Sequence, residues 1–111
     1  MSTPQSVPEV PATAVPDDAW LLDVREPYEW AAGHVPTARH IPLAQIGHRT
    51  EEIPREDKIY VICRSGARSA RVTMALTGAG WDAVNVAGGM QDWAAGGRPM
   101  VSDTGAEPTV A

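Results

Sequence analysis

The chain has 111 residues, of which 43% are hydrophobic and 21% charged, and its formal net charge is −5 at pH 7. A chain of this length builds one domain around a modest core and leaves no room for a second domain. The acidic balance and the lack of an evident basic face argue against a nucleic-acid partner. We therefore interpret the four tryptophans as core or rim packing rather than as a platform for stacked bases; they are Trp20, Trp30, Trp81 and Trp93.

The cysteine content and the terminal sequence also limit the possible classes. The single cysteine excludes an internal disulfide and a metal site made of cysteines alone. The start of the chain, M-S-T-P-Q-S-V-P-E-V-P, lacks the basic residues and the apolar stretch of a signal peptide, and no later segment has the length of a membrane span. We expect a cytoplasmic protein without a membrane partner.

The two ends of the chain differ in composition from its middle. Prolines at positions 4, 8, 11 and 16 prevent a continuous helix, so residues 1–18 are expected to form an N-terminal arm. In this arm Val7 to Val10 can add an edge strand, where proline is tolerated, and the first few residues should be frayed. Residues 101–111 are small and polar, which predicts a disordered tail and leaves residues 19–100 for the folded domain.

Strand patterns and short helical patterns alternate between these ends. Runs of apolar and β-branched residues indicate buried strands, and apolar residues three or four apart that end near glycine indicate helices. In chain order we expect a strand at Trp20–Val24, a helix at Glu26–Gly33, a strand at Ala38–Ile41, an amphipathic helix at Leu43–Glu52 interrupted by Gly47, a strand at Ile59–Ile62, a helix at Ser69–Gly78, a strand at Ala83–Val86, a flexible turn at Gly88–Gly89 and a helix at Met90–Ala95. This alternation predicts an α/β fold with a small parallel sheet of about five short strands and helices on both faces.

Cys63 lies where the central strand should end and the longest helix should begin. In an open α/β sheet, ligands gather at this edge, where a helix N-terminus presents unpaired N–H groups and the positive end of its dipole. The loop from Arg64 to Arg68 contains Gly66, which can adopt a positive φ, so successive amides can point toward one centre. We expect little tolerance for a Cβ at Gly66. The sequence thus predicts an anion site at the Cys63 sulfur.

The charge of this loop is opposite to that of the whole chain. From Cys63 to Arg71 there are three arginines and no acid. With the loop amides, they should favour thiolate over thiol and make the cysteine reactive. The alternative is an inert buried strand cysteine beside arginines on a solvated helix face. The cysteine, the glycine-bearing loop and the arginines together favour the reactive thiolate.

The motif C-R-S-G-A-R-S after an apolar strand resembles the active-site loop of rhodanese-like sulfurtransferases. The similarity extends to D-V-R-E-P-Y-E-W-A-A-G-H-V-P-T-A upstream and to G-G-M-Q-D-W downstream, and it covers about Trp20 to Pro99. In that family the cysteine accepts a sulfane sulfur from a donor such as thiosulfate, becomes a persulfide and passes the sulfur to a nucleophilic acceptor. The resemblance implies a rhodanese-like fold, this catalytic role for Cys63, and an active-site loop made of Arg64, Ser65, Gly66, Ala67, Arg68 and Ser69.

Such chemistry requires no cofactor, and its partners are a small sulfur donor and an acceptor such as cyanide, a thiol or a protein. Arg64 and Arg68 could bind the thiosulfate dianion or screen the thiolate, and we expect Arg64 to point to solvent at the mouth of the site. Asp23 and Arg25, at the end of a neighbouring strand, could bond each other or hold the Cys63 loop. The resemblance favours Asp23 as a support for the loop.

No metal site is expected. The histidines have no spacing typical of metal ligands, and none is near the cysteine in the sequence; they are His34, His40 and His48.

Two other functions use related features. A cysteine phosphatase or arsenate reductase also holds a thiolate in an anion-binding loop, but its signature has five residues between cysteine and arginine, whereas Cys63 and Arg68 enclose four. The shorter loop suits one sulfur atom better than a tetrahedral oxyanion. A non-catalytic rhodanese-like binding or regulatory module would be expected to lack the cysteine or the small-residue loop. Because this chain keeps both, sulfur transfer is the leading interpretation.

Overall fold

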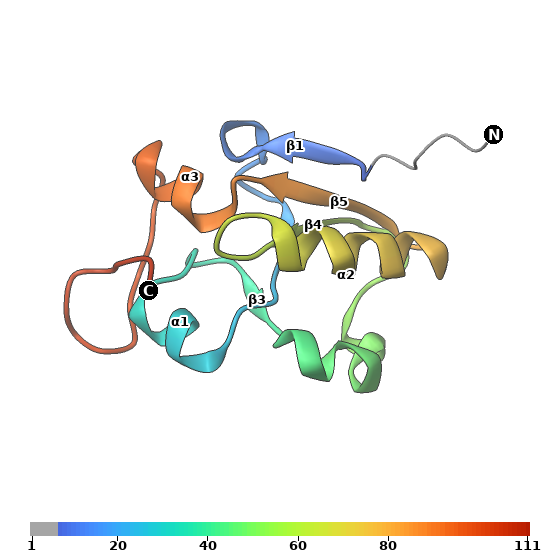
Figure 1. The fold of residues 1–111 in the computed structure, drawn as a ribbon, viewed down its shortest axis with the longest axis horizontal. Helices are drawn as coiled ribbons and strands as arrows, with labels where there is room; N and C mark the ends of the chain where they lie inside the picture. The colour runs from blue at the N-terminus through green and yellow to red at the C-terminus, as the bar shows by residue number, and fades with distance from the viewer. Residues whose placement is uncertain (1–6) are drawn as a thin grey trace.

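The computed structural model of the chain describes residues 7–111, which are built around one parallel sheet (Figure 1). Within these residues the sheet has five strands in the order β1-β5-β4-β2-β3, and every pairing is parallel. The strands are β1 (Glu9–Pro11), β2 (Trp20–Asp23), β3 (Arg39–His40), β4 (Lys58–Ile62) and β5 (Asp82–Ala87). The predicted α/β fold with short parallel strands is confirmed. The predicted fraying of the first few residues lies outside the described part of the chain.

Short helices connect the strands. Residues 7–111 contain the α-helices α1 (Pro27–Ala32), α2 (Ala67–Gly78) and α3 (Gly89–Ala95), and the 3-10 helices η1 (Ala12–Ala14), η2 (Leu43–His48) and η3 (Thr50–Glu52). The N-terminal arm supplies β1 at one edge of the sheet, at Glu9–Pro11 rather than at the expected Val7–Val10. In the described part of the chain, no helix is long and apolar enough to cross a bilayer.

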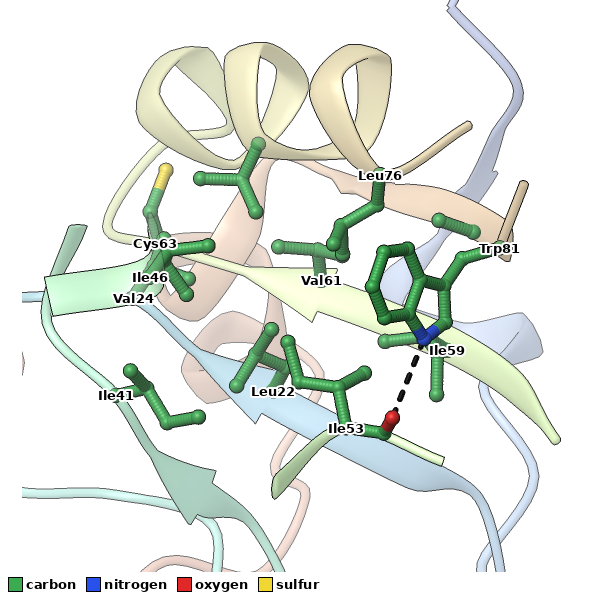
Figure 2. Close-up of a cluster of buried hydrophobic side chains, with 12 residues drawn as sticks. Leu22, Val24, Ile41, Ile46, Ile53, Ile59, Val61, Cys63, Leu76 and Trp81 are labelled. Carbon is green, nitrogen blue, oxygen red and sulfur yellow. Dashed lines mark hydrogen bonds between the residues drawn. The ribbon is translucent and has the colours of Figure 1, made fainter. Parts of the chain in front are cut away.

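A first hydrophobic cluster fills the α2 side of the sheet (Figure 2). Strand side chains alternate between the two faces, so Ile59 and Val61 of β4 point to this side, and Cys63 continues the same alternation beyond the strand. Its buried residues are Leu22, Val24, Ile41, Ile46, Ile53, Ile59, Val61, Cys63, Val72, Leu76, Trp81 and Ala83. The Cys63 side chain is therefore part of this buried cluster.

A second cluster fills the opposite face, which places helices on both sides of the sheet as predicted. It joins alternate strand residues to α3 and to the N-terminal arm. Its buried residues are Ala12, Val15, Leu21, Val35, Ile62, Val86, Met90 and Trp93. Trp81 and Trp93 are buried as expected, and the Trp81 indole N–H also donates a hydrogen bond of 3.2 Å to the Ile53 carbonyl (Figure 2).

The segment expected to form an amphipathic helix at Leu43–Glu52, interrupted by Gly47, forms two short 3-10 helices, η2 and η3. Leu43 and Ile46 are three residues apart, and a 3-10 helix with three residues per turn places both on the side of the first cluster. Gly47 lowers the stability of a continuous α-helix at this point. The inward direction of Leu43, Ile46 and Ile53 was predicted correctly.

The expected disordered tail is folded back against α1 in the structure (Figure 1). The amides of Asp103 and Thr109 donate hydrogen bonds of 2.9 Å to the carbonyls of Ala31 and Ala32. The last carbonyls of a helix lack partners within the helix, so the tail satisfies groups that α1 leaves open. Val110 also packs against the second cluster. Composition alone does not show such pairing.

Candidate active site around Cys63

Cys63 directly follows β4, at the carboxyl edge of the sheet, and its sulfur points toward the first turn of α2 (Figure 2). The residue is 1% exposed and is a free cysteine. Two donors reach the sulfur: the Gly66 amide at 3.1 Å and the Ser69 hydroxyl at 3.2 Å. The predicted position of the cysteine between a strand and a helix N-terminus is what the structure shows.

Gly66 gives the loop its curvature. Its φ of +109° lies in the left-handed region, which glycine adopts without strain, and it precedes the first residue of α2. A Cβ on this residue would lie 3.3 Å from the Gly88 amide nitrogen, so a side chain would be both strained and crowded. The predicted intolerance for a Cβ at Gly66 thus has a geometric basis.

Opposing effects set the acidity of Cys63. Burial is the largest single effect and raises the pKa of the thiol, whereas the hydrogen bond from the Ser69 hydroxyl and the amides of Ser69, Gly66 and Ser65 lower it. The net result is a pKa below the ordinary value for cysteine. The arginines were expected to contribute to this effect, but the groups that lower the pKa of Cys63 are the loop amides and the Ser69 hydroxyl.

The arginines are oriented differently from one another. Arg64 is exposed, as predicted, and its Nε donates a hydrogen bond of 2.9 Å to the Ala111 carbonyl. Arg68 donates two hydrogen bonds, of 2.7 and 2.9 Å, to the two carboxylate oxygens of Glu29 on α1. The Glu29 side chain is 3% exposed and that of Arg68 31% exposed, so this pair lies at the boundary between core and solvent. Most of the Arg68 charge is thereby balanced.

The ion pair also shifts both titrating groups. The hydrogen bonds from Arg68 lower the pKa of the Glu29 carboxyl despite its burial, and Glu29 in turn raises the pKa of Arg68. Because the thiolate of Cys63 also raises the pKa of Arg68, this guanidinium lies within electrostatic range of the sulfur.

Asp23 and Arg25 bond each other in the core. Both side chains are fully buried, and Arg25 Nη2 lies 2.7 Å from Asp23 Oδ2. Arg25 further donates to the carbonyls of Glu29 and Gly33, at 3.3 and 2.8 Å. In the described residues, no hydrogen bond joins this pair to the loop 64–69. The pair therefore holds α1, whose Glu29 in turn contacts Arg68 of the loop.

The backbone at the start of α3 holds the other side of the site. The Met90 amide donates to the Cys63 carbonyl at 2.8 Å, and the Gln91 amide donates to the Arg64 carbonyl at 3.0 Å. Gly89 has a φ of +54°, and a Cβ there would lie 2.7 Å from the Arg64 carbonyl carbon and closer still to the Cys63 carbonyl oxygen. The pair Gly88–Gly89 was expected to be a flexible turn, but Gly89 lies in close backbone contact with Cys63 and Arg64.

Sequence reasoning missed three residues of this site. Glu29 was included in a short helix without a role, Gly89 was expected in a flexible turn, and Asn85 was included in a strand without a role. The available signal for Asn85 was one amide side chain in an otherwise apolar run, and for Gly89 it was the doubled glycine directly after a strand.

Two of the histidines, His34 and His40, belong to the packing around α1, whereas His48 is exposed in η2. His34 stacks on the Trp30 indole with ring centroids 3.6 Å apart, and His40 stacks on the same indole at 4.8 Å. In the part of the chain that the structure describes, no group of histidine, cysteine and acidic side chains is arranged to hold a metal ion.

These features define a class: a small α/β domain that places one acidic thiol, ringed by amides, at the carboxyl edge of a parallel sheet. The family model of the rhodanese-like domain matches residues 10–96, and the chain belongs to this family. The resemblance based on the loop and its two flanking motifs is confirmed.

Individual relatives agree with this assignment. The chain is 39% identical over 90 residues to a protein of Allochromatium vinosum named "Sulfurtransferase", a match that covers 80% of this chain and 84% of that protein. It is 42% identical over 74 residues to YrkF of Bacillus subtilis, covering 66% of this chain but only 40% of YrkF. Among solved structures, the rhodanese-related protein TVG0868615 of Thermoplasma volcanium has a TM-score of 0.80 at 32% identity, covering 85% of this chain and 97% of that one.

Proposed function

We propose that this chain is a sulfurtransferase that moves a sulfane sulfur from thiosulfate, or a similar donor, to a thiophilic acceptor through a persulfide on Cys63. The observation that carries the proposal is the Cys63 sulfur, which lies 3.1 Å from the Gly66 amide and 3.2 Å from the Ser69 hydroxyl and whose pKa is lowered by these groups. A double-displacement cycle needs such a thiolate and no resident cofactor.

In the first half of the cycle, the Cys63 thiolate attacks the outer sulfur of thiosulfate. A new bond forms between Sγ and this sulfur, and the S–S bond of thiosulfate breaks, so that sulfite leaves with the electron pair. In the second half, cyanide or a thiolate attacks the terminal sulfur of the persulfide, and the Cys63 thiolate is the leaving group. Because both resting forms of Cys63 carry a negative charge, the same amides can stabilise each of them.

The two loop arginines have different roles in this proposal. Arg68 keeps both of its amino groups on Glu29, so it contributes a balanced charge and fixes the start of α2. Arg64 is exposed beside the reacting cysteine, and we assign to it the first contact with the anionic donor.

The acceptor must come from outside the domain. Cys63 is the only cysteine of the chain, so no second thiol of this chain can receive the sulfur. We propose a small thiol, cyanide or a protein thiol as the acceptor, in a cytoplasmic setting where a lone cysteine stays reduced.

The test is a thiosulfate-to-cyanide assay with wild type, Cys63→Ser and Thr77→Ala, an exposed α2 residue that serves as the control. We expect thiocyanate formation by wild type and the control, none above background by Cys63→Ser, and a mass gain of about 32 Da on Cys63 when thiosulfate is given without acceptor. A wild type that forms neither thiocyanate nor the persulfide with thiosulfate or other sulfane donors would instead support a binding module.

The loop argues against phosphatase or arsenate reductase chemistry. Four residues separate Cys63 from Arg68, and the guanidinium that would clamp a phosphoryl group is bound to Glu29. We expect aryl phosphate hydrolysis to be negligible, because too few donors remain for three equatorial oxygens. Hydrolysis through Cys63 at a rate comparable to sulfur transfer would contradict the proposed function.

A further inference from the structure

Asn85 is the one amide side chain in the middle of β5, and it is only 2% exposed. Asn85 lies on the strand next to β4 and is paired with Val61, which comes two residues before Cys63. An amide in such a layer destabilises the fold unless its donors and acceptor are all used. Its contacts therefore indicate what it does.

The side chain of Asn85 bonds both residues that donate to the sulfur. Its Nδ2 donates a hydrogen bond of 3.2 Å to the Gly66 carbonyl and one of 3.4 Å to a carboxylate oxygen of Glu9 on β1. Its Oδ1 accepts a hydrogen bond of 2.5 Å from the Ser69 hydroxyl. Because both amide hydrogens are occupied, only the oxygen is available to Ser69.

The Ser69 hydroxyl faces two acceptors but has one hydrogen. The acceptors are Asn85 Oδ1 at 2.5 Å and Cys63 Sγ at 3.2 Å, and a single O–H cannot donate to both at full strength. An uncharged sulfur is a weak acceptor, whereas a thiolate is a strong one, since hydrogen bonds to ionised groups are about twice as strong as neutral ones. The direction of this hydroxyl must therefore depend on the charge of the sulfur.

We propose that Asn85 is a positioning residue that holds the Ser69 hydroxyl while the sulfur of Cys63 is neutral and releases it to the sulfur when the sulfur becomes charged. In this proposal Asn85 does not bind the sulfur donor or the sulfur acceptor, and it acts through Ser69. The inference deepens the proposed function, on which its catalytic meaning rests, but the hydrogen-bond competition itself requires no sulfur donor.

Other charged groups near the sulfur set a constant background. Arg68, with Glu29 as its partner, lies within electrostatic range of Cys63, and Glu9 contacts the amide end of Asn85. None of these residues is changed in the variants below. Differences among the variants therefore report the contest for the Ser69 hydrogen.

The test measures the rate of Cys63 alkylation by iodoacetamide against pH in wild type, Asn85→Leu, Ser69→Ala and the double variant. Removing Ser69 deletes the donor, so we expect the midpoint to rise by about one pH unit. Removing Asn85 deletes only the competitor, so we expect the midpoint to fall by roughly half a pH unit. In the double variant the effect of Asn85 should vanish, and its midpoint should equal that of Ser69→Ala.

Folding of the variants is protected by a second contact. The Gly66 carbonyl also accepts a hydrogen bond of 3.1 Å from the Ala70 amide, so it keeps a partner when Asn85 is replaced. Asn85→Val, which resembles the neighbouring Val84 and Val86, tests the same competition with a smaller side chain should leucine not fit. Melting curves show which variants are folded, and the exposed Thr77→Ala serves as the reference variant.

The outcomes separate the proposal from a purely structural role. A midpoint that is unchanged or raised in folded Asn85→Leu or Asn85→Val overturns the inference, because Asn85 would then only hold the loop. A fall that persists when Ser69 is absent also overturns it. If the competition is found but the protein transfers no sulfur to any acceptor, the proposed function fails while the assignment of Asn85 remains.

Discussion

Replacing Gly89 by alanine should disrupt the backbone contact between the start of α3 and Cys63, and the loss in unfolding free energy can be worked out from the structure. Its φ of +54° is a left-handed conformation, which costs an alanine about 1 kcal/mol. The added Cβ would overlap the Cys63 and Arg64 backbone, so α3 must move away. This movement breaks the hydrogen bonds from Met90 to Cys63 and from Gln91 to Arg64, at about 1 kcal/mol each. The sum is about 3 kcal/mol, or a melting temperature lower by roughly 10–20 °C.

Gly97 provides the matched control. Its φ is +71°, but a Cβ there would meet no atom within 4 Å, so Gly97→Ala should cost only the conformational term of about 1 kcal/mol. Thermal unfolding, monitored by circular dichroism, compares the stability of the two variants with that of wild type. The pH midpoint of Cys63 alkylation shows whether the loop 64–69 still holds its donors near the sulfur. Equal melting temperatures for Gly89→Ala and Gly97→Ala would refute the idea that close backbone contact at Gly89 supports the cysteine.

Three further predictions concern charges. The pKa of Cys63 is lower in the folded state, so ionisation of this thiol stabilises the fold. This stabilisation is fully present above the unfolded pKa of about 8.5 and is lost as pH falls through the folded pKa. The difference in unfolding free energy between wild type and Cys63→Ser should therefore grow as pH rises toward about 9. A difference in denaturant midpoints that shrinks with rising pH would contradict this sign. Glu29→Gln should cost about 2 kcal/mol in urea unfolding, because it leaves the Arg68 guanidinium without its carboxylate partner at the start of α2; an unchanged unfolding midpoint would show that the pair is dispensable. Asp23→Asn should cost about 3–5 kcal/mol, because the Arg25 charge would remain buried without a counter-ion, and a loss below about 1 kcal/mol would contradict this.

Local patterns were sufficient to predict the sheet and the position of the cysteine. The run from Ile59 to Ile62 is apolar and β-branched, and the next helix begins within a few residues, so Cys63 had to lie at the carboxyl edge. Gly66 was also predictable, because a short loop that curls its amides toward one centre needs a residue with positive φ. Each of these inferences depends on neighbours within a few positions in the sequence.

The partners of the charged residues were not predictable in this way. Arg68 pairs with Glu29, which is 39 positions earlier in the chain, and nothing in the loop sequence distinguishes a clamped arginine from a free one. Arg25 bonds Asp23 and α1 rather than the loop, although Asp23 ends β2 beside β4 and Arg25 follows two residues later. Long-range pairing of this kind is determined by the packed fold. The three arginines that are close to Cys63 in the sequence therefore do not all stabilise its thiolate.

The source of thiolate stabilisation has a structural consequence. Dipoles act over shorter distances than free charges, so the amide of Gly66 and the hydroxyl of Ser69 are effective only because they lie 3.1 and 3.2 Å from the sulfur. A site built on free arginines would tolerate small shifts, whereas this one depends on distances of a few tenths of an ångström. The residues that support these two donors should therefore govern reactivity here: Gly89 fixes the backbone of Cys63, and Asn85 competes with the sulfur for the Ser69 hydrogen.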